Sequence, residues 1–178
     1  MTQELWVFGY GSLMWRPDFE FVDRRPALVR GYHRALCVYS HVHRGAVERP
    51  GLVLGLDRGG SCRGVVFRVE SSRAAATLAY LREREQVTSV YREAVLPALL
   101  PGGDSVAAVA YVADRRHPQY AGRLERGDLL RLIRQGVGLS GRNVDYVLNT
   151  CVHLAELDIR DETLEWLADA LADETTSG

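Results

Sequence analysis

The sequence predicts an α+β fold built on a largely antiparallel or barrel-like sheet. Apolar, β-prone segments occupy the first two thirds of the chain, interrupted by one helix-like segment, and helix-periodic segments fill the last third. Strands and helices that are segregated along the chain in this way favour an α+β fold over a parallel sheet with alternating helices. The chain has no internal repeat, low-complexity segment or linker, so we expect residues 1–178 to form a single domain.

The expected strands are runs of apolar and β-branched residues bounded by turn-forming residues. They cover residues 5–8, 27–40, 52–56, 62–70, 91–100 and 105–114. The segment "DRGGS", residues 57–61, predicts a hairpin loop, because its two glycines favour a tight turn. Pro101, Gly102 and Gly103 predict a second hairpin turn, between the last two strands.

One helix is expected between the strands and two or three after them. Ser71 and Ser72 can cap a helix that begins near Arg73. Beyond Leu124, apolar residues keep helical spacing through residues 144–155 and again through residues 164–171. Asp161 is expected to cap the last helix, and the polar tail from about residue 173 is expected to be frayed.

Composition and charge argue against several classes of protein. Apolar residues make up 47% of the chain and charged residues 25%, as in ordinary globular proteins. The formal net charge is −1, so no basic excess indicates nucleic acid or an anionic membrane as a partner. We recognise no signal peptide and no apolar run long enough to span a membrane.

The cysteines and histidines do not indicate a metal site. Cys37, Cys62 and Cys151 lie far apart and form neither a disulfide framework nor a C-x-x-C pair. We expect three buried, reduced thiols and therefore a cytoplasmic protein. His41 and His43 could bind a metal from one face of a strand, but the nearby acids and cysteines lack complementary spacing, so no metal is expected.

The first expected strand runs into "GYGS", in which Tyr10 stands between Gly9 and Gly11. Two missing Cβ atoms permit a tight bend with positive φ and a close approach to the backbone. The segment is then either a turn that ends a strand or a loop whose N–H groups cradle a ligand's oxygens. It matches neither a dinucleotide fingerprint nor a phosphate-binding P-loop, and Ser12 lacks the G-x-S-x-G context of a serine hydrolase.

The charged segment "YLREREQ", residues 80–86, contains a carboxylate that helical spacing places on an apolar face. Leu78, Leu81 and Glu85 share this face, whereas Glu83 lies further round the helix. A helix end and an apolar environment both disfavour a charged carboxylate, so we expect the pKa of Glu85 to be raised. A glutamate of this kind is suited to act as a general base. The alternative is a structural ion pair between Glu85 and Arg82.

Five segments, in order across nearly the whole chain, resemble the ChaC-type γ-glutamylcyclotransferases. They are "VFGYGSLMW" (residues 7–15), "SHVHRGAVERPGLVLGL" (40–56), "YLREREQVTSVY" (80–91), "VADRRHPQYAG" (112–122) and "GLSGRNVDYVLNTCVHLAELDIRD" (138–161). The resemblance implies a small mixed or antiparallel β-barrel with flanking helices, the γ-glutamylcyclotransferase-like fold, and no cofactor. It also implies an enzyme that cleaves a small-molecule substrate, glutathione, to 5-oxoproline and cysteinylglycine.

The resemblance also assigns roles to individual residues. Glu85 closes the family's "Y-L-x-x-R-E" motif and is implied to be the catalytic residue. Ser89 departs from the pattern, because relatives often carry glycine in the corresponding "V-T-G-x-Y" segment. The family's Tyr-Gly-Ser-Leu loop binds the γ-glutamyl part of the substrate, and here it comprises Tyr10, Gly11, Ser12 and Leu13.

Tyr91 and Arg44 are further candidates for substrate contacts, each with a structural alternative. Tyr91 could instead pack within a strand, and Arg44 could be a surface charge. Two other functions stay open. One is a related cyclotransferase that acts on other γ-glutamyl amino acids or γ-glutamylamines; the other is a non-catalytic ligand-binding module, against which an inward Glu85 argues. The sequence predicts no particular oligomeric state.

Overall fold

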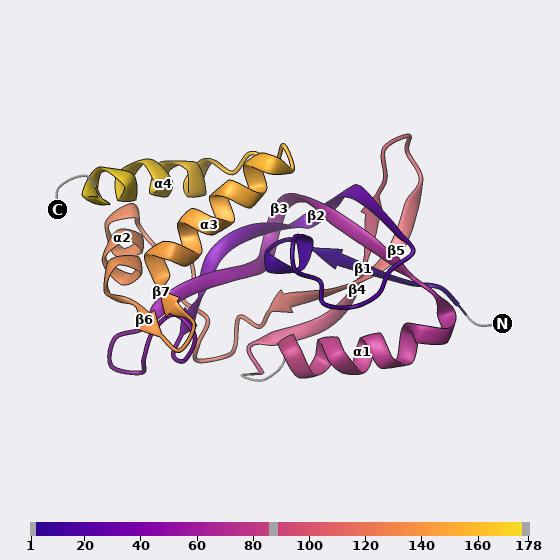
Figure 1. Cartoon of the computed structure of the whole chain (residues 1–178), viewed down its shortest axis with the longest axis horizontal. Coiled ribbons are helices and arrows are strands. Elements are labelled where there is room, and N and C mark those ends of the chain that lie inside the picture. Colours follow the sequence, from indigo (N-terminus) through magenta and orange to yellow (C-terminus); the bar gives the residue numbers. More distant parts are fainter. Residues whose placement is uncertain (1–2, 86–88, 176–178) are drawn as a thin grey trace. The chain divides into compact units, whose positions relative to one another are not determined.

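Five strands close into a barrel, and the described residues also form α-helices, which confirms the predicted α+β class (Figure 1). The structure is a computed structural model that describes residues 3–85 and 89–175. Around the barrel the strands follow the order β1-β3-β2-β4-β5. Their bounds are β1 (Leu5–Gly9), β2 (Asp23–Ser40), β3 (Gly51–Val69), β4 (Tyr91–Leu99) and β5 (Ser105–Ala113).

The remaining elements are helices and one short sheet. The α-helices in the described residues are α1 (Ser71–Glu85), α2 (Arg126–Gln135), α3 (Asn143–Glu156) and α4 (Glu162–Thr175). A 3₁₀ turn, η1 (Ser12–Met14), follows β1, and a two-stranded sheet pairs β6 (Val137–Gly138) with β7 (Gly141–Arg142). None of the helices described is both long and apolar enough to cross a membrane.

The chain divides into two compact units. Residues 1–35 and 54–120 form the first unit, and residues 36–53 and 121–178 form the second. The first unit holds β1, α1, β4, β5 and the larger parts of β2 and β3. The second holds the remaining ends of β2 and β3 together with α2, α3, α4 and the β6–β7 sheet. The expectation of a single domain stays a prediction.

Both antiparallel and parallel pairings build the barrel. β1 pairs with β3 in antiparallel register from Leu5↔Val69 to Gly9↔Val65, and it meets β5 in parallel at Val7↔Val109. β4 and β5 form an antiparallel hairpin from Tyr91↔Ala113 to Leu99↔Ser105. This hairpin and its turn were predicted and are confirmed: Gly102 and Gly103 have φ of +99° and +102°, a backbone conformation that glycine adopts readily.

The hairpin loop predicted at residues 57–61 is wrong, because β3 continues unbroken from Gly51 to Val69. Gly59 and Gly60 have φ of +105° and +67°, so the two glycines bend the strand instead of ending it. The ring nitrogen Nδ1 of His33 on β2 lies 3.0 Å from the Gly59 carbonyl oxygen. A long strand with such a bend can follow the curvature that a small closed barrel requires.

The core of the first unit joins helix α1 to the barrel. Leu81 of α1 is fully buried in a cluster with residues of β1, β3, β5 and the η1 turn. The buried members of this cluster are Leu5, Val7, Leu13, Val69, Leu81 and Tyr111, and the partly buried Tyr91 packs against them. Burying a leucine side chain contributes about 1.5–3 kcal/mol, so Leu81 fixes the last turns of α1 against the barrel.

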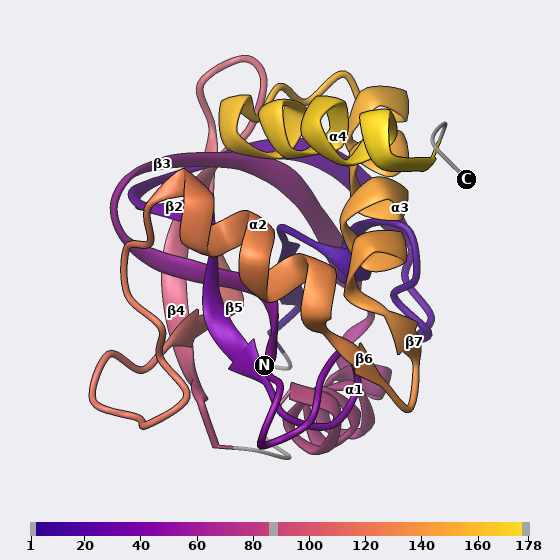
Figure 2. The same ribbon diagram turned by 90° about the vertical axis from the view of Figure 1, so that its left-hand side faces the viewer.

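The helices of the second unit match the predicted periodicity. α3 and α4 lie side by side in both views (Figures 1 and 2). The amide of Leu164 donates to Oδ1 of Asp161 at 3.0 Å, which confirms the predicted cap of α4. The tail predicted from about residue 173 is helical to Thr175, and residues 176–178 lie outside the described part of the chain.

Asn143, at the start of α3, is a polar side chain with no solvent exposure. Its Oδ1 accepts from the Leu52 amide at 2.7 Å, and its Nδ2 donates to the Leu52 carbonyl at 2.8 Å. One side chain thereby satisfies both backbone groups of a buried strand residue. Since an unpaired buried polar group is costly, Asn143 fixes this end of β3 within the second unit.

Replacing Asn143 with alanine should lower the free energy of unfolding by about 2–4 kcal/mol, because both Leu52 backbone groups would lose their partners in a buried site. Urea denaturation followed by circular dichroism measures the change. Asn149→Ala, at an exposed position of the same helix, is the matched control and should change the stability by less than about 0.5 kcal/mol. Equal effects in the two variants would contradict the role assigned to Asn143.

Candidate active site

The loop after β1 folds back tightly on the end of the strand. The amide of Met14 donates to the Gly11 carbonyl at 2.9 Å, and the amide of Arg16 donates to the Ser12 carbonyl at 2.7 Å. A Cβ atom on Gly9 would lie 3.1 Å from the Leu13 Cβ and 3.3 Å from the Met14 nitrogen. A side chain at Gly9 would therefore crowd the turn that follows it.

The positive φ that the two glycines permit does not occur, since no residue between Gly9 and Leu13 is left-handed. Gly11 has φ of −134°, and a Cβ there would meet Leu54 Cδ1 at an ordinary 3.5 Å. Of the four loop residues assigned to substrate binding, Tyr10, Gly11 and Leu13 are buried and Ser12 is exposed. Leu13 belongs to the apolar core, so its side chain anchors the loop to the barrel.

Glu85 is the last residue of α1, and only 18% of its side chain is exposed. It lies one turn beyond the buried Leu81, on the face that helical spacing predicted, whereas Glu83 is exposed. Burial raises the pKa of the Glu85 carboxyl, and the Arg84 guanidinium, whose Nε lies 3.7 Å from Oε1, opposes this shift only in part. The predicted raised pKa is confirmed.

The alternative partner considered for Glu85 is engaged elsewhere. Arg82 forms two-point contacts with Glu93 of β4, with Nε–Oε1 at 3.1 Å and Nη2–Oε2 at 3.0 Å. Tyr111 donates its hydroxyl to the same Glu93 carboxylate at 3.0 Å. The Arg82 hydrogen bond is the main reason why the pKa of Glu93 is lowered. The idea of an ion pair between Arg82 and Glu85 is therefore wrong.

Arg84 is a site residue that the sequence reasoning missed. Its Nη2 donates to Ser12 Oγ at 3.1 Å, and its Nη1 donates to the carbonyls of Arg16 and Pro17 at 2.8 and 3.2 Å. Nη1 also lies 3.2 Å from the Tyr80 hydroxyl. The sequence carried one signal: Tyr80 and Arg84 are four residues apart, a spacing at which side chains on a helix meet. One guanidinium thus ties the end of α1 to the loop.

Tyr91 lies on the barrel strand that follows the helix. Its hydroxyl donates to the Leu54 carbonyl at 2.7 Å, and Leu54 in turn faces the Cβ position of Gly11. Tyr91 also packs against the cluster that contains Leu13 and Leu81. The structure therefore brings the loop, the end of α1 and Tyr91 to one part of the first unit.

Arg44 belongs to the second unit. Its Nη1 donates to the Arg142 carbonyl at 3.2 Å, and its guanidinium lies 5.5 Å from the centre of the Tyr146 ring. Its backbone amide donates to Ser40 Oγ at 2.9 Å. These contacts order the 41–50 segment within its own unit, and a substrate contact by Arg44 stays a prediction.

No metal-binding group of three or more His, Cys, Asp or Glu side chains occurs among the residues described. His41 stacks on Tyr39 with ring centres 6.4 Å apart, and His43 Nδ1 lies 3.0 Å from Ser140 Oγ. None of the three cysteines forms a disulfide; Cys37 and Cys62 are buried, but Cys151 is only partly buried, contrary to expectation. Burial raises the pKa of the Cys151 thiol to about 11, and nearby carboxylates act in the same direction. It is thus a poor nucleophile at neutral pH.

The fold is that of the γ-glutamyl cyclotransferases. The crystal structure of a yeast γ-glutamyl cyclotransferase specific to glutathione matches with a TM-score of 0.86 over 96% of both chains, at 21% sequence identity. The family model for ChaC-like proteins matches residues 5–174. The chain therefore belongs to the ChaC-like family, which confirms the predicted resemblance.

Two relatives illustrate how far the similarity extends. The glutathione-specific γ-glutamylcyclotransferase of Escherichia coli (strain K12) is 33% identical over 160 residues, which cover 90% of this chain and 69% of the relative. Glutathione-specific γ-glutamylcyclotransferase 1 of Mus musculus is 36% identical over 175 residues, covering 95% and 78% of the two chains. Both alignments thus cover most of this chain and most of the relative.

Removing the charge of Glu85 should stabilise the protein in a pH-dependent way. Because the folded-state pKa is raised above the ordinary 4.5, the unfavourable charge appears only as the pH rises above that value. Glu85→Gln should therefore gain stability over the natural protein at pH 7 to 8 and lose this advantage below about pH 4.5. Urea denaturation at several pH values measures the difference, and the exposed Glu83→Gln is the control. An unchanged or lowered stability of Glu85→Gln at pH 7 would contradict the assignment.

Arg84→Gln should loosen the loop that Arg84 holds. The glutamine cannot reach Ser12 and the Arg16 and Pro17 carbonyls together, so the backbone amides of residues 12–16 and 18 should exchange with solvent several-fold faster. Hydrogen–deuterium exchange with mass spectrometry measures this directly. Arg82→Gln removes the same charge from the same helix but should leave exchange at residues 12–18 unchanged. Equal protection in both variants would show that Arg84 does not position the loop.

Proposed function

We propose that the protein is a glutathione-specific γ-glutamylcyclotransferase that releases 5-oxoproline and cysteinylglycine. The observation that carries the proposal is a largely buried glutamate with a raised pKa at the end of α1, tied through Arg84 to the loop after β1. Membership of the ChaC-like family and the names of the E. coli and mouse relatives support the choice of glutathione.

The reaction needs few protein groups because both reacting centres belong to one substrate. The α-amine of the γ-glutamyl part attacks its own γ-carbonyl carbon, so a C–N bond forms and closes a five-membered ring. The amide bond to cysteine then breaks, and the leaving amine takes a proton. A site that holds the substrate in a folded pose supplies the proximity that such an attack requires.

Glu85 is proposed to move the proton. As a carboxylate it accepts a proton from the attacking nitrogen, and as a carboxylic acid it returns the proton to the leaving nitrogen. Burial makes the carboxylate more basic than an exposed glutamate, which suits the first step, and keeps the protonated form accessible for the second. No second acid or base is required.

The loop is proposed to bind the oxygens of the γ-glutamyl group. The first amides of a helical turn have no hydrogen-bond partner within that turn, so the amides of Ser12 and Leu13 at the start of η1 are suited to hold a carboxylate or the developing oxyanion. Arg84 is proposed as a positioning residue that fixes this loop relative to Glu85.

Three cysteines without a disulfide and a glutathione substrate support a reducing, cytoplasmic compartment for this reaction.

Incubation of the purified protein with reduced glutathione should yield equal amounts of 5-oxoproline and cysteinylglycine, detected by mass spectrometry. The same assay with other γ-glutamyl amino acids and γ-glutamylamines tests the related cyclotransferase. Glutamate in place of 5-oxoproline would indicate hydrolysis and contradict the proposal. Turnover of the other γ-glutamyl compounds without turnover of glutathione would favour the alternative substrate class, and no turnover of any would favour a binding module.

Glu85→Gln should lower kcat by about 10² or more, because glutamine keeps the shape of the side chain but cannot accept a proton. Steady-state kinetics with glutathione measures the loss, and thermal melting verifies that the variant is folded. Glu83→Gln, at an exposed position two residues away, should keep nearly full activity. An active Glu85→Gln enzyme would remove the basis of the mechanism.

A further inference from the structure

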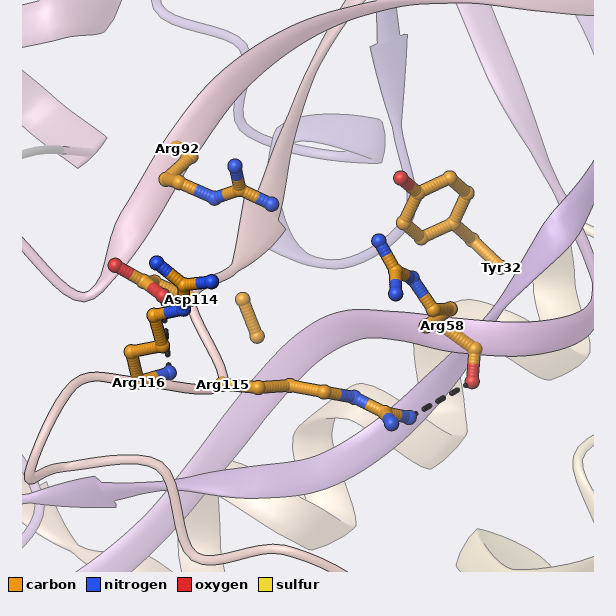
Figure 3. A pocket seen from close by; sticks show the side chains of 7 residues that line it. Tyr32, Arg58, Arg92, Asp114, Arg115 and Arg116 are labelled. Atoms are coloured by element: carbon orange, nitrogen blue, oxygen red, sulfur yellow. Dashed lines mark hydrogen bonds between the residues drawn. The ribbon is translucent and has the colours of Figure 1, made fainter.

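A cavity of the first unit, of about 330 Å³, has a lining dominated by arginine (Figure 3). It contains none of the residues assigned to the active site. The side chains that define its chemistry are Tyr32 of β2, Arg58 of β3, Arg92 of β4, and Asp114, Arg115 and Arg116 after β5. The lining therefore contains four guanidinium groups and one carboxylate, whereas the whole chain has a formal net charge of −1.

The cavity and the active site use different residues of β4. Tyr91 and Arg92 are consecutive residues of β4, and consecutive side chains of a strand point to opposite faces of a sheet. Tyr91 packs against the apolar cluster beside the loop after β1, whereas Arg92 lines the arginine cavity. Occupation of one site therefore does not require the other.

One of the four arginines is held in place by the protein. Arg115 Nε donates to Asp57 Oδ1 at 2.9 Å, and its Nη2 donates to the Arg58 carbonyl at 3.0 Å. The Tyr120 hydroxyl donates to the other Asp57 oxygen at 2.7 Å. Burial acts to raise the pKa of Asp57, but these hydrogen bonds outweigh it and lower the pKa, so the carboxylate stays charged and fixes Arg115. The wall of the cavity is thus ordered.

The other three arginines have no such partner in the described part of the chain. Within residues 3–85 and 89–175, no hydrogen bond or ion pair of the guanidinium groups of Arg58, Arg92 and Arg116 is present. Asp114 accepts the backbone amide of Arg116 at 3.0 Å. Figure 3 shows Arg92 on one side of the cavity and Arg58 with Tyr32 on the other, with Arg92 and the Tyr32 hydroxyl directed toward the space between them.

We propose that this cavity binds a compact polyanion, a diphosphate group that is either free pyrophosphate or part of a nucleotide. Several unpaired guanidinium groups repel one another unless an anion lies between them, and guanidinium binds phosphate oxygens through paired N–H donors. The Tyr32 hydroxyl adds a neutral donor. The volume fits a small ligand. A long polyanion such as RNA would need an extended basic surface, which the near-neutral net charge does not favour.

Isothermal titration of the full-length protein with pyrophosphate at low salt tests the proposal, and ADP in a parallel titration distinguishes the two sources of the diphosphate. Saturable binding with one site per chain is expected, and it should weaken as salt is added. Arg58→Gln and Arg92→Gln should each weaken binding by about tenfold or more. Arg63→Gln removes the same charge from an exposed position on the same strand as Arg58, outside the cavity, and should change the affinity less than twofold.

The site is separate from the proposed catalytic centre, so Glu85→Gln should bind pyrophosphate as the natural protein does. Labelling of the natural protein with phenylglyoxal, which modifies arginine, provides a test that needs no variant: pyrophosphate should protect Arg92 and Arg116 but not Arg63. Absence of saturable binding, equal affinity in Arg58→Gln, Arg92→Gln and Arg63→Gln, or equal labelling with and without pyrophosphate would each overturn the proposal. Single-stranded RNA that binds more tightly than either diphosphate compound would also overturn it.

Discussion

The site depends on one physical constraint, the removal of the Glu85 carboxylate from water at the end of α1. A charge in such a place is unfavourable, and Arg84 compensates it only in part across 3.7 Å. A structural role would be better served by a shorter contact or a neutral residue, since a poorly paired buried charge costs stability. The raised pKa therefore favours the proton-transfer role proposed for Glu85 over a structural ion pair.

Apolar packing against the barrel keeps the Glu85 carboxylate in this buried position. Leu81 buries the last turns of α1 against β1, β3 and β5, and Leu13 anchors the loop after β1 in the same cluster. Gly9 lets that loop turn back closely on its own strand. Arg84 then connects the loop and the helix by hydrogen bonds from a single guanidinium group. The elements of the site are thus held by the same core that stabilises the first unit.

The sequence predicted the features that local residue patterns determine. Helical spacing placed Glu85 correctly, and turn chemistry located the β4–β5 hairpin and the Asp161 cap. It failed where tertiary structure decides: Gly59 and Gly60 bend a strand that the barrel continues, although the same residues would end a strand elsewhere. The pairing of Arg82 with Glu93 and of Arg84 with Ser12 could not be predicted either, because these residues become neighbours only after folding.

Direct titration of Glu85 tests the central claim. Carboxyl ¹³C NMR of the natural protein, with the Glu85 signal assigned by its loss in Glu85→Gln, gives the pKa of this one group in the folded state. We predict a pKa of Glu85 clearly above the ordinary 4.5, because burial disfavours its charged form. A pKa of Glu85 at or below 4.5 would mean that Arg84 holds it as a permanently charged ion pair, and would contradict its role in moving the proton.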